Sequence, residues 1–123
     1  MIHPSYLLLY VESPEASARF YGALLQTAPV ESSPTFALFV LDSGLKLGLW
    51  ARDTVAPAPV APAGGSEIGF SLAGDSAVDE TFVDWKARGV PMILEPTTLE
   101  FGRSFVALDP DGHRLRVYAL ADG

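Results

Sequence analysis

Apolar residues alternate with polar or small residues along several short segments of this chain, a pattern that predicts half-buried β-strands. The clearest example is residues 101–118, where two alternating segments flank the sequence DPDG at 109–112. Proline presets φ for a turn and glycine accepts the positive φ that ends it, so these segments predict a β-hairpin. In its second strand, Arg114 and Arg116 face away from the apolar positions and must point to water, an interface or a cavity.

The same reading predicts one order of elements in each half of the chain. Ser13 is the expected N-cap of the first helix and Ser76 that of the second, with Gly89 as a C-terminal stop. The expected strands of the first half are 5–11, a weak strand near 28–32, 35–41 and 45–50. Those of the second half are 67–72, a short strand near 91–94 and the two strands of the hairpin. The helices are expected to end near Leu25 and Arg88. The expected buried faces of the helices are Ala16, Phe20, Tyr21 and Leu24 in the first and Val78, Phe82 and Trp85 in the second.

A proline- and alanine-rich segment at 55–66 separates the two halves and predicts an extended linker. We therefore expect one domain over 1–123, made of module 1 at about 1–54, this linker and module 2 at about 67–123. The repeated order takes priority over residue-level detail. It predicts an α+β fold in which tandem βαβββ modules form a curled mixed sheet around a cavity, with the helices on the outside.

Strand alternation also predicts which residues face that cavity. If the leucines of 45–50 meet a helix, then Gly48 and Trp50 face the cavity, and Glu67 does so by the same argument for 67–72. A tryptophan at this position can stack on a planar ring, although it can equally belong to the core or to a dimer interface. The parity of 35–41 does not decide whether Phe36 or Phe39 lines the cavity.

Bulk composition excludes several classes of function. The formal net charge of −7 argues against sequence-independent nucleic-acid binding and against anionic membrane surfaces. No apolar run approaches the ~20 residues that span a bilayer, and the N-terminal residues do not resemble a signal peptide. The chain has no cysteine, which excludes thiolate catalysis and Cys-ligated zinc and fits a cytoplasmic protein.

Two longer motifs resemble a known family. The helix sequence SPEASARFYGALL and the hairpin sequence FVALDPDGHRLRVY, together with the tandem βαβββ order, resemble the vicinal oxygen chelate superfamily of glyoxalase I, ring-cleaving dioxygenases and bleomycin and fosfomycin resistance proteins. The sequences GLW, SEIG, FGR and DPDGH are most similar to those of phenazine antibiotic resistance proteins. That resemblance implies sequestration of a planar drug without chemical modification.

The resemblance also implies where metal-dependent members carry their ligands. Those positions correspond here to Tyr6, Gly48, Glu67 and Arg116, of which one is a carboxylate and one a cation. Divalent metals of this class require several histidine or carboxylate ligands. His3 precedes the first strand and His113 lies at the turn, so neither completes the set. We expect no metal, no cofactor and no catalytic residue, and the chain leans away from being an enzyme.

The candidate ligand-binding residues are Tyr6, Gly48, Trp50, Glu67, Phe101, Arg103, Phe105 and Arg116. Trp50 with Phe101 or Phe105 would stack on the ligand, and the charged residues would anchor its polar groups. Each has a simpler alternative: Glu67 and Arg116 can form a structural salt bridge, Arg103 can be solvated, and Tyr6 can be a core tyrosine.

Three hypotheses follow. The first is a metal-independent homodimer that binds and sequesters a phenazine-like aromatic antibiotic and so confers resistance, its cavities being completed across the interface. The second is a metal-dependent lyase, isomerase or dioxygenase of the same superfamily, its metal held by Glu67 and by residues outside the positions that the resemblance assigns. The third is a structural or regulatory module whose cavity is filled by its own side chains.

Overall fold

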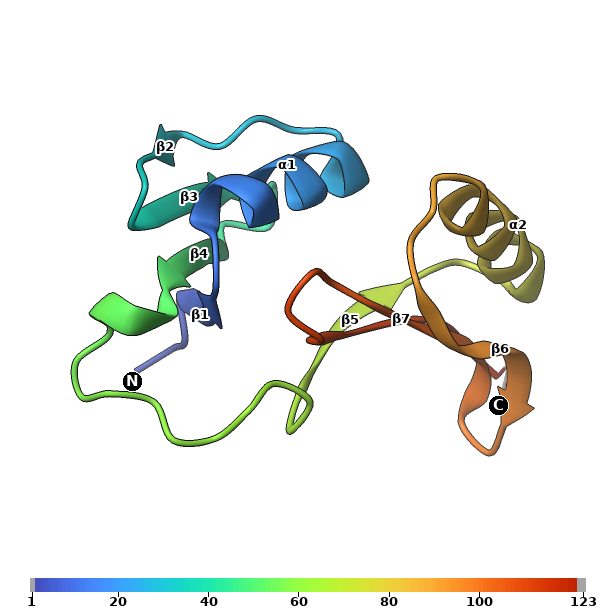
Figure 1. The fold of residues 1–123 in the computed structure, drawn as a ribbon. Helices are drawn as coiled ribbons and strands as arrows, with labels where there is room; N and C mark the ends of the chain where they lie inside the picture. The colour runs from blue at the N-terminus through green and yellow to red at the C-terminus, as the bar shows by residue number, and fades with distance from the viewer. Residues whose placement is uncertain (1, 122–123) are drawn as a thin grey trace. The chain divides into compact units, whose positions relative to one another are not determined.

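The computed structural model describes residues 2–121 of the chain. Contacts divide the chain into two compact units, unit 1 (Met1–Ala61) and unit 2 (Pro62–Gly123). Within the described residues, each unit has one α-helix and one four-stranded mixed sheet, in the order βαβββ (Figure 1). The α+β fold with tandem βαβββ modules is therefore confirmed. No helix among residues 2–121 is long and apolar enough to cross a membrane.

Unit 1 forms a sheet whose strands are ordered β1-β4-β3-β2, with β1 parallel to β4 and the other pairs antiparallel. Its elements are β1 (Tyr6–Val11), α1 (Pro14–Leu25), β2 (Glu31–Ser32), β3 (Phe36–Val40), β4 (Lys46–Ala51) and the 3₁₀ turn η1 (Arg52–Thr54). Helix α1 packs on β3 and β4. The core between this helix and the sheet includes Tyr21 of α1 and, from the strands, Leu9, Val11, Ala37, Phe39, Leu47 and Leu49.

The start of α1 follows the sequence expectation. The Ser13 side chain accepts a hydrogen bond from the Ala16 backbone N–H at 3.2 Å, and Pro14 occupies the first turn. The expected buried face of this helix is wrong in detail, because Ala16, Phe20 and Leu24 are only half-buried. The buried residues of α1 are Pro14, Ser17, Ala18 and Tyr21, and the small side chains among them allow close packing against the sheet.

Unit 2 repeats the arrangement with strand order β5-β8-β7-β6 and β5 parallel to β8. Its elements are β5 (Glu67–Ser71), α2 (Asp75–Ala87), β6 (Met92–Leu99), β7 (Gly102–Leu108) and β8 (Arg114–Leu120). Helix α2 packs on β6, β7 and β8, and between the η1 turn and β5 no helix or strand forms.

The ends of α2 differ in how well they were predicted. The N-cap is Gly74 and not Ser76, and no side chain caps the helix, so the expected cap is wrong. The C-terminal stop at Gly89 is confirmed: its φ is 85°, its N–H donates to the Lys86 carbonyl at 3.0 Å, and the Val90 N–H donates to the Trp85 carbonyl at 3.0 Å. This pair of bonds is a Schellman motif, which glycine favours because it accepts a positive φ.

Candidate functional site

The open face of the unit 1 sheet, opposite α1, carries an aromatic hollow of about 370 Å³. It is lined by Tyr6, Leu8, Phe36 and Trp50. The strand register places these side chains on one face, because Leu8 is paired with Gly48 and Phe36 with Trp50. Phe39 lies on the other face and is fully buried, so Phe36 is the phenylalanine that lines the hollow. The hollow is therefore apolar, with aromatic groups from three strands.

Gly48 lies beneath this hollow but does not leave empty space. A Cβ atom there would lie 2.6 Å from Leu8 Cδ2, 3.0 Å from Phe36 Cζ and 3.0 Å from Tyr6 Cε1. The side chains of these three residues fold over the glycine and form the floor. Gly48 contributes by its lack of a side chain, and Leu8, which was not among the expected site residues, forms the floor together with Tyr6 and Phe36.

Two contacts orient the rings at the ends of the hollow. The Tyr10 ring meets Trp50 edge-to-face, with centroids 6.2 Å apart, and the Lys46 ammonium lies 5.8 Å from the Tyr6 ring centroid. Trp50 is half-buried, and Tyr6 is 40% exposed. Both rings therefore retain surface on which a planar molecule can pack.

The open face of the unit 2 sheet carries a polar cluster instead. Arg116 Nε and Nη2 donate to the two carboxylate oxygens of Glu67 at 2.8 and 2.9 Å, and Nη1 donates to Ser104 Oγ at 3.0 Å. Ser104 is fully buried, and Arg114 Nη1 lies 3.9 Å from the same carboxylate. The contact expected between Glu67 and Arg116 is thus present, and Ser104 is an additional partner that only the register of β7 and β8 reveals.

The charges of this cluster reinforce one another. The hydrogen bonds from Arg116 hold the pKa of Glu67 below its ordinary value, against the opposing effect of partial burial. The same hydrogen bonds raise the pKa of Arg116. Glu67 therefore stays an anion below neutral pH, and Arg116 stays a cation above it.

Phe101 covers part of this cluster. Its ring centroid lies 6.0 Å from Arg116 Cζ, and its ring meets Tyr118 edge-to-face at 6.2 Å. Gly102 makes this possible: its φ is 145°, and a Cβ there would collide with the Ala119 carbonyl oxygen. The sequence FGR therefore brings Phe101 over β8 through the conformation of its glycine.

Arg103 and Phe105 lie on the opposite, helix-covered face of the same sheet. Phe105 is fully buried, with ring centroids 5.5 Å from both Phe82 and Trp85. Arg103 Nε donates to Asp79 of α2 at 2.7 Å. The structure therefore does not bring these two residues together with Phe101 and Arg116, because the alternation of β7 turns them toward α2.

The residues that the resemblance assigns to metal-ligand positions do not offer the donors that a divalent metal requires. Gly48 offers no donor and Arg116 is a cation, while both oxygens of Glu67 are bound by Arg116. Tyr6 is the remaining member and is a weak ligand in its neutral form. Sites for these metals are built from several carboxylates, histidines or thiolates.

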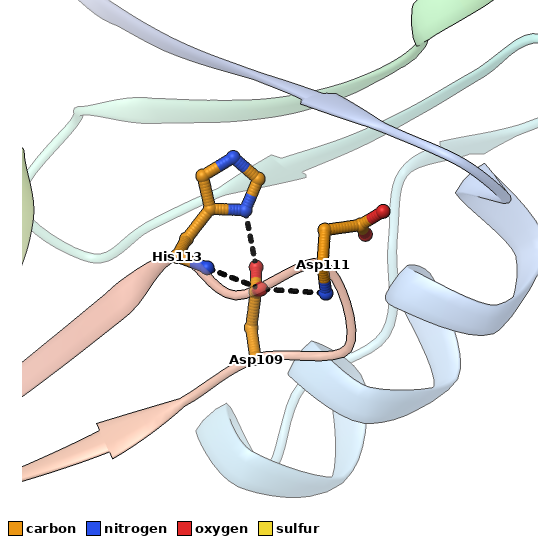
Figure 2. A group of neighbouring side chains, drawn as sticks. All are labelled: Asp109, Asp111 and His113. Atoms are coloured by element: carbon orange, nitrogen blue, oxygen red, sulfur yellow. Dashed lines mark hydrogen bonds and ion pairs between the residues drawn. The ribbon is translucent and has the colours of Figure 1, made fainter. Parts of the chain in front are cut away.

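A second group of possible metal donors lies at the hairpin turn, where ligand atoms of Asp109, Asp111 and His113 lie within 4.8 Å of one another (Figure 2). Asp109 Oδ1 accepts hydrogen bonds from the backbone N–H groups of Asp111 and His113 at 2.9 and 2.8 Å. Asp109 Oδ2 lies 2.8 Å from His113 Nδ1. Hydrogen bonds within the turn thus engage both oxygens of the buried carboxylate, which gives Asp109 a structural role in closing the hairpin.

Comparison with known proteins gives consistent matches over nearly the whole chain. The family model of the Glyoxalase/Bleomycin resistance protein/Dioxygenase superfamily matches residues 3–117. The phenazine antibiotic resistance protein EhpR of Enterobacter agglomerans is 35% identical, over 97% of this chain and 93% of EhpR.

Solved structures match as well. The solution NMR structure of protein ATC0852 from Agrobacterium tumefaciens is 56% identical, with a TM-score of 0.90, and the match covers 99% of this chain and 100% of that one. A glyoxalase/bleomycin resistance protein/dioxygenase from Nocardioides is 24% identical, with a TM-score of 0.85 over 100% of this chain and 86% of its own, and it shares the fold.

Proposed function

Because this chain belongs to the Glyoxalase/Bleomycin resistance protein/Dioxygenase superfamily, we propose that it binds a planar aromatic small molecule of the phenazine class without a metal ion. Binding would protect the cell by sequestration in the cytoplasm. This mode of protection requires tight binding and enough protein, and it requires no turnover. The similarity to EhpR, whose name records phenazine antibiotic resistance, supports the ligand class.

The observation that carries the proposal is the aromatic hollow of unit 1. Its lining residues, Tyr6, Leu8, Phe36 and Trp50, present rings and methyl groups and no charged group. Sites for small molecules are typically concave and apolar with a few polar groups. Stacking of aromatic rings contributes about 0.5–1.5 kcal/mol beyond the burial of apolar surface. A flat, uncharged ring system suits such a hollow better than a sugar, a nucleotide phosphate or a peptide.

Unit 2 carries, by itself, a second candidate surface for a small molecule, the polar cluster of Arg116 with Phe101 beside it. Arg116 can donate hydrogen bonds to ligand acceptors, and Phe101, 42% exposed, can offer a ring face. Glu67 holds Arg116 in place and is proposed as its positioning partner. We leave Arg103 and Phe105 out of the proposed site, because they contact α2 instead.

Metal independence rests on the donor chemistry described above. The position that would hold a third-strand ligand is Gly48, and the position on the last strand is Arg116. An arginine repels a divalent cation and engages the carboxylate that would bind it. A metal-dependent lyase or dioxygenase would have to assemble its ligands elsewhere in the chain.

Titration of the protein with phenazine, followed by tryptophan fluorescence, tests the proposal. Bound ring systems should quench Trp50, while Trp85, which is 7% exposed and packed against Phe105, should respond little. Trp50→Ala should weaken binding by about tenfold or more, and Trp50→Phe by less, because the phenyl ring still stacks. Equal affinity in Trp50→Ala and the unaltered protein, measured by calorimetry, would refute the stacking role.

Elemental analysis separates the proposal from the metal-dependent alternative. Purified protein should carry no stoichiometric divalent metal, and phenazine affinity should be the same with and without a chelator. A tightly held metal ion in one-to-one ratio, removed with loss of binding, would favour the enzyme hypothesis.

We also propose that the chain acts as a homodimer. The unit 1 sheet exposes an apolar face with Tyr6, Leu8 and Tyr10 each at least 37% exposed, which favours burial against a partner or ligand. Light scattering should give twice the chain mass of 13.1 kDa. A monomer at micromolar concentration would contradict this part of the proposal.

A further inference from the structure

One charged side chain stands beside the aromatic hollow of unit 1. Strand alternation puts Lys46 on the open face of β4 together with Gly48 and Trp50. Lys46 is paired with Tyr6 in the strand register, and its ammonium nitrogen lies 5.8 Å from the centroid of the Tyr6 ring. Because Tyr6 lines the hollow, this ammonium group lies at the edge of the hollow.

The ammonium group is not neutralised by a neighbouring acid. Among residues 2–121, no carboxylate lies within ion-pair distance of the Lys46 nitrogen. The contact with the Tyr6 ring is a cation–π interaction, which is weak where water reaches the cation, and Lys46 is exposed. The positive charge therefore stays available to an anion that enters the hollow.

Lys46 is also the one charged side chain that the three lining strands β1, β3 and β4 present on this face. The other residues of these strands on the open face are Tyr6, Leu8, Tyr10, Phe36, Leu38, Val40, Gly48 and Trp50. Glu31 of the edge strand β2 shares the face, since it is paired with Leu38, but β3 separates its strand from β4. The charge that these strands give the hollow is thus positive, although the whole chain carries −7.

Lys46 and Trp50 mark the two ends of the hollow along β4. They lie four residues apart on the same face, which corresponds to about 13 Å along the strand. A ring system of three fused rings with one substituent covers a length of this order. The hollow therefore has an aromatic end at Trp50, an apolar floor and a cationic end at Lys46.

We propose, resting on the function proposed above, that the hollow is selective for planar aromatic acids, with the rings stacked on Trp50 and the acidic group at Lys46. The ammonium carries three N–H donors and no acceptor, so it binds a carboxylate and repels a cationic substituent. Its flexible four-carbon stem lets it follow the position of the acid. Because the pair stays in contact with water, neither ion loses much of its hydration.

Two probes of the same shape test the inference. Phenazine-2-carboxylate carries a negative charge at neutral pH, and phenazine-2-carboxamide does not, while their ring systems are identical. We expect the acid to bind about three- to tenfold more tightly in calorimetry, between the values of an exposed ion pair and of a hydrogen bond to a charged group. The preference should shrink at about 0.5 M salt, which screens exposed charges.

Variants of Lys46 assign the preference to its charge. Lys46→Gln should bring the two affinities to within about twofold, Lys46→Arg should keep the preference, and Lys46→Glu should reverse it because like charges repel. The affinity for the amide should change by no more than about twofold in all three variants, since Lys46 is exposed and does not line the hollow. This readout separates lost recognition of charge from a damaged hollow.

Lys86→Gln is the matched control. The Lys86 ammonium of α2 lies 5.5 Å from the Phe82 ring centroid, so this variant removes the same charge from a similar contact in unit 2, and its preference should equal that of the unaltered protein. Equal affinities of the unaltered protein for acid and amide would overturn the inference and leave the proposed function intact. A preference that persists in Lys46→Gln would overturn the assignment to Lys46. If neither probe binds, the proposed function fails and the inference fails with it.

Discussion

Arg116 engages both carboxylate oxygens of Glu67, so the charge of this acidic side chain is already balanced by a residue of its own sheet. The pair links β5 to β8 and faces away from α2. The pair holds the Arg116 guanidinium on this face of the sheet, where it also donates to Ser104.

Acid should weaken the protein partly through this pair. Because Arg116 lowers the folded-state pKa of Glu67, the pair stabilises the fold above the unfolded pKa of about 4.3 and loses that contribution as pH falls through the folded-state pKa. Glu67→Gln should therefore show a shallower loss of stability between about pH 5 and pH 3 in urea titrations. The difference should stay below about 1 kcal/mol, because both side chains are partly solvated. Parallel pH profiles for the two proteins would contradict this.

Phe101 and Phe105 are both among the candidate ligand-binding residues of the sequence, but their substitution should have different effects on stability and on binding. Phe105→Ala removes a fully buried ring that contacts Phe82 and Trp85, and should cost about 3–5 kcal/mol in the free energy of unfolding. Phe101→Ala should cost about 1 kcal/mol or less, since the ring is 42% exposed, but should weaken phenazine binding severalfold. Chemical denaturation and calorimetry on both variants distinguish the two roles.

Gly102 should tolerate no side chain. A Cβ atom would collide with the carbonyl oxygen of Ala119, and backbone atoms cannot move aside cheaply, so Gly102→Ala should destabilise the protein by about 3 kcal/mol or more. Gly44→Ala is the matched control, because Gly44 also has a positive φ, of 93°, with open space around it. That variant should cost about 1 kcal/mol. Equal costs for the two variants in thermal unfolding would show that φ alone, and not the collision, matters.

Asp109 should prove structural and independent of metal. Asp109→Ala leaves the backbone N–H groups of Asp111 and His113 without their acceptor, and should cost about 1–3 kcal/mol. The loss should be the same in the presence of a chelator and of zinc or manganese. Metal-dependent stabilisation of the unaltered protein that disappears in Asp109→Ala would identify the turn as a metal site instead.

The elements were predictable from sequence because their signals are local. Ser13 caps α1 by its own side chain, Gly89 ends α2 by its own φ, and the leucines of β4 alternate toward α1. The cap of α2 was missed because Gly74 has no side chain to signal it.

The sites were only partly predictable because they depend on register and on adjoining strands. The contact between Glu67 and Arg116 was expected from strand alternation together with the family resemblance, and it is present. Phe105 was misjudged because β7 is buried on both faces, so its sequence does not alternate strongly. Ser104, Leu8 and Phe36 could not be assigned until pairing placed them beside Arg116 and Gly48.

The floor over Gly48 consists of the tips of three side chains, and none of it is backbone. Side chains can change rotamer, so the depth of the hollow depends on the rotamers of these three residues and can adjust to the size of a bound molecule. A change at Leu8, which is 41% exposed and whose side chain makes no hydrogen bond, would resize the hollow while leaving the strands in register. The volume of the hollow can thus be changed by one substitution without rebuilding the sheet.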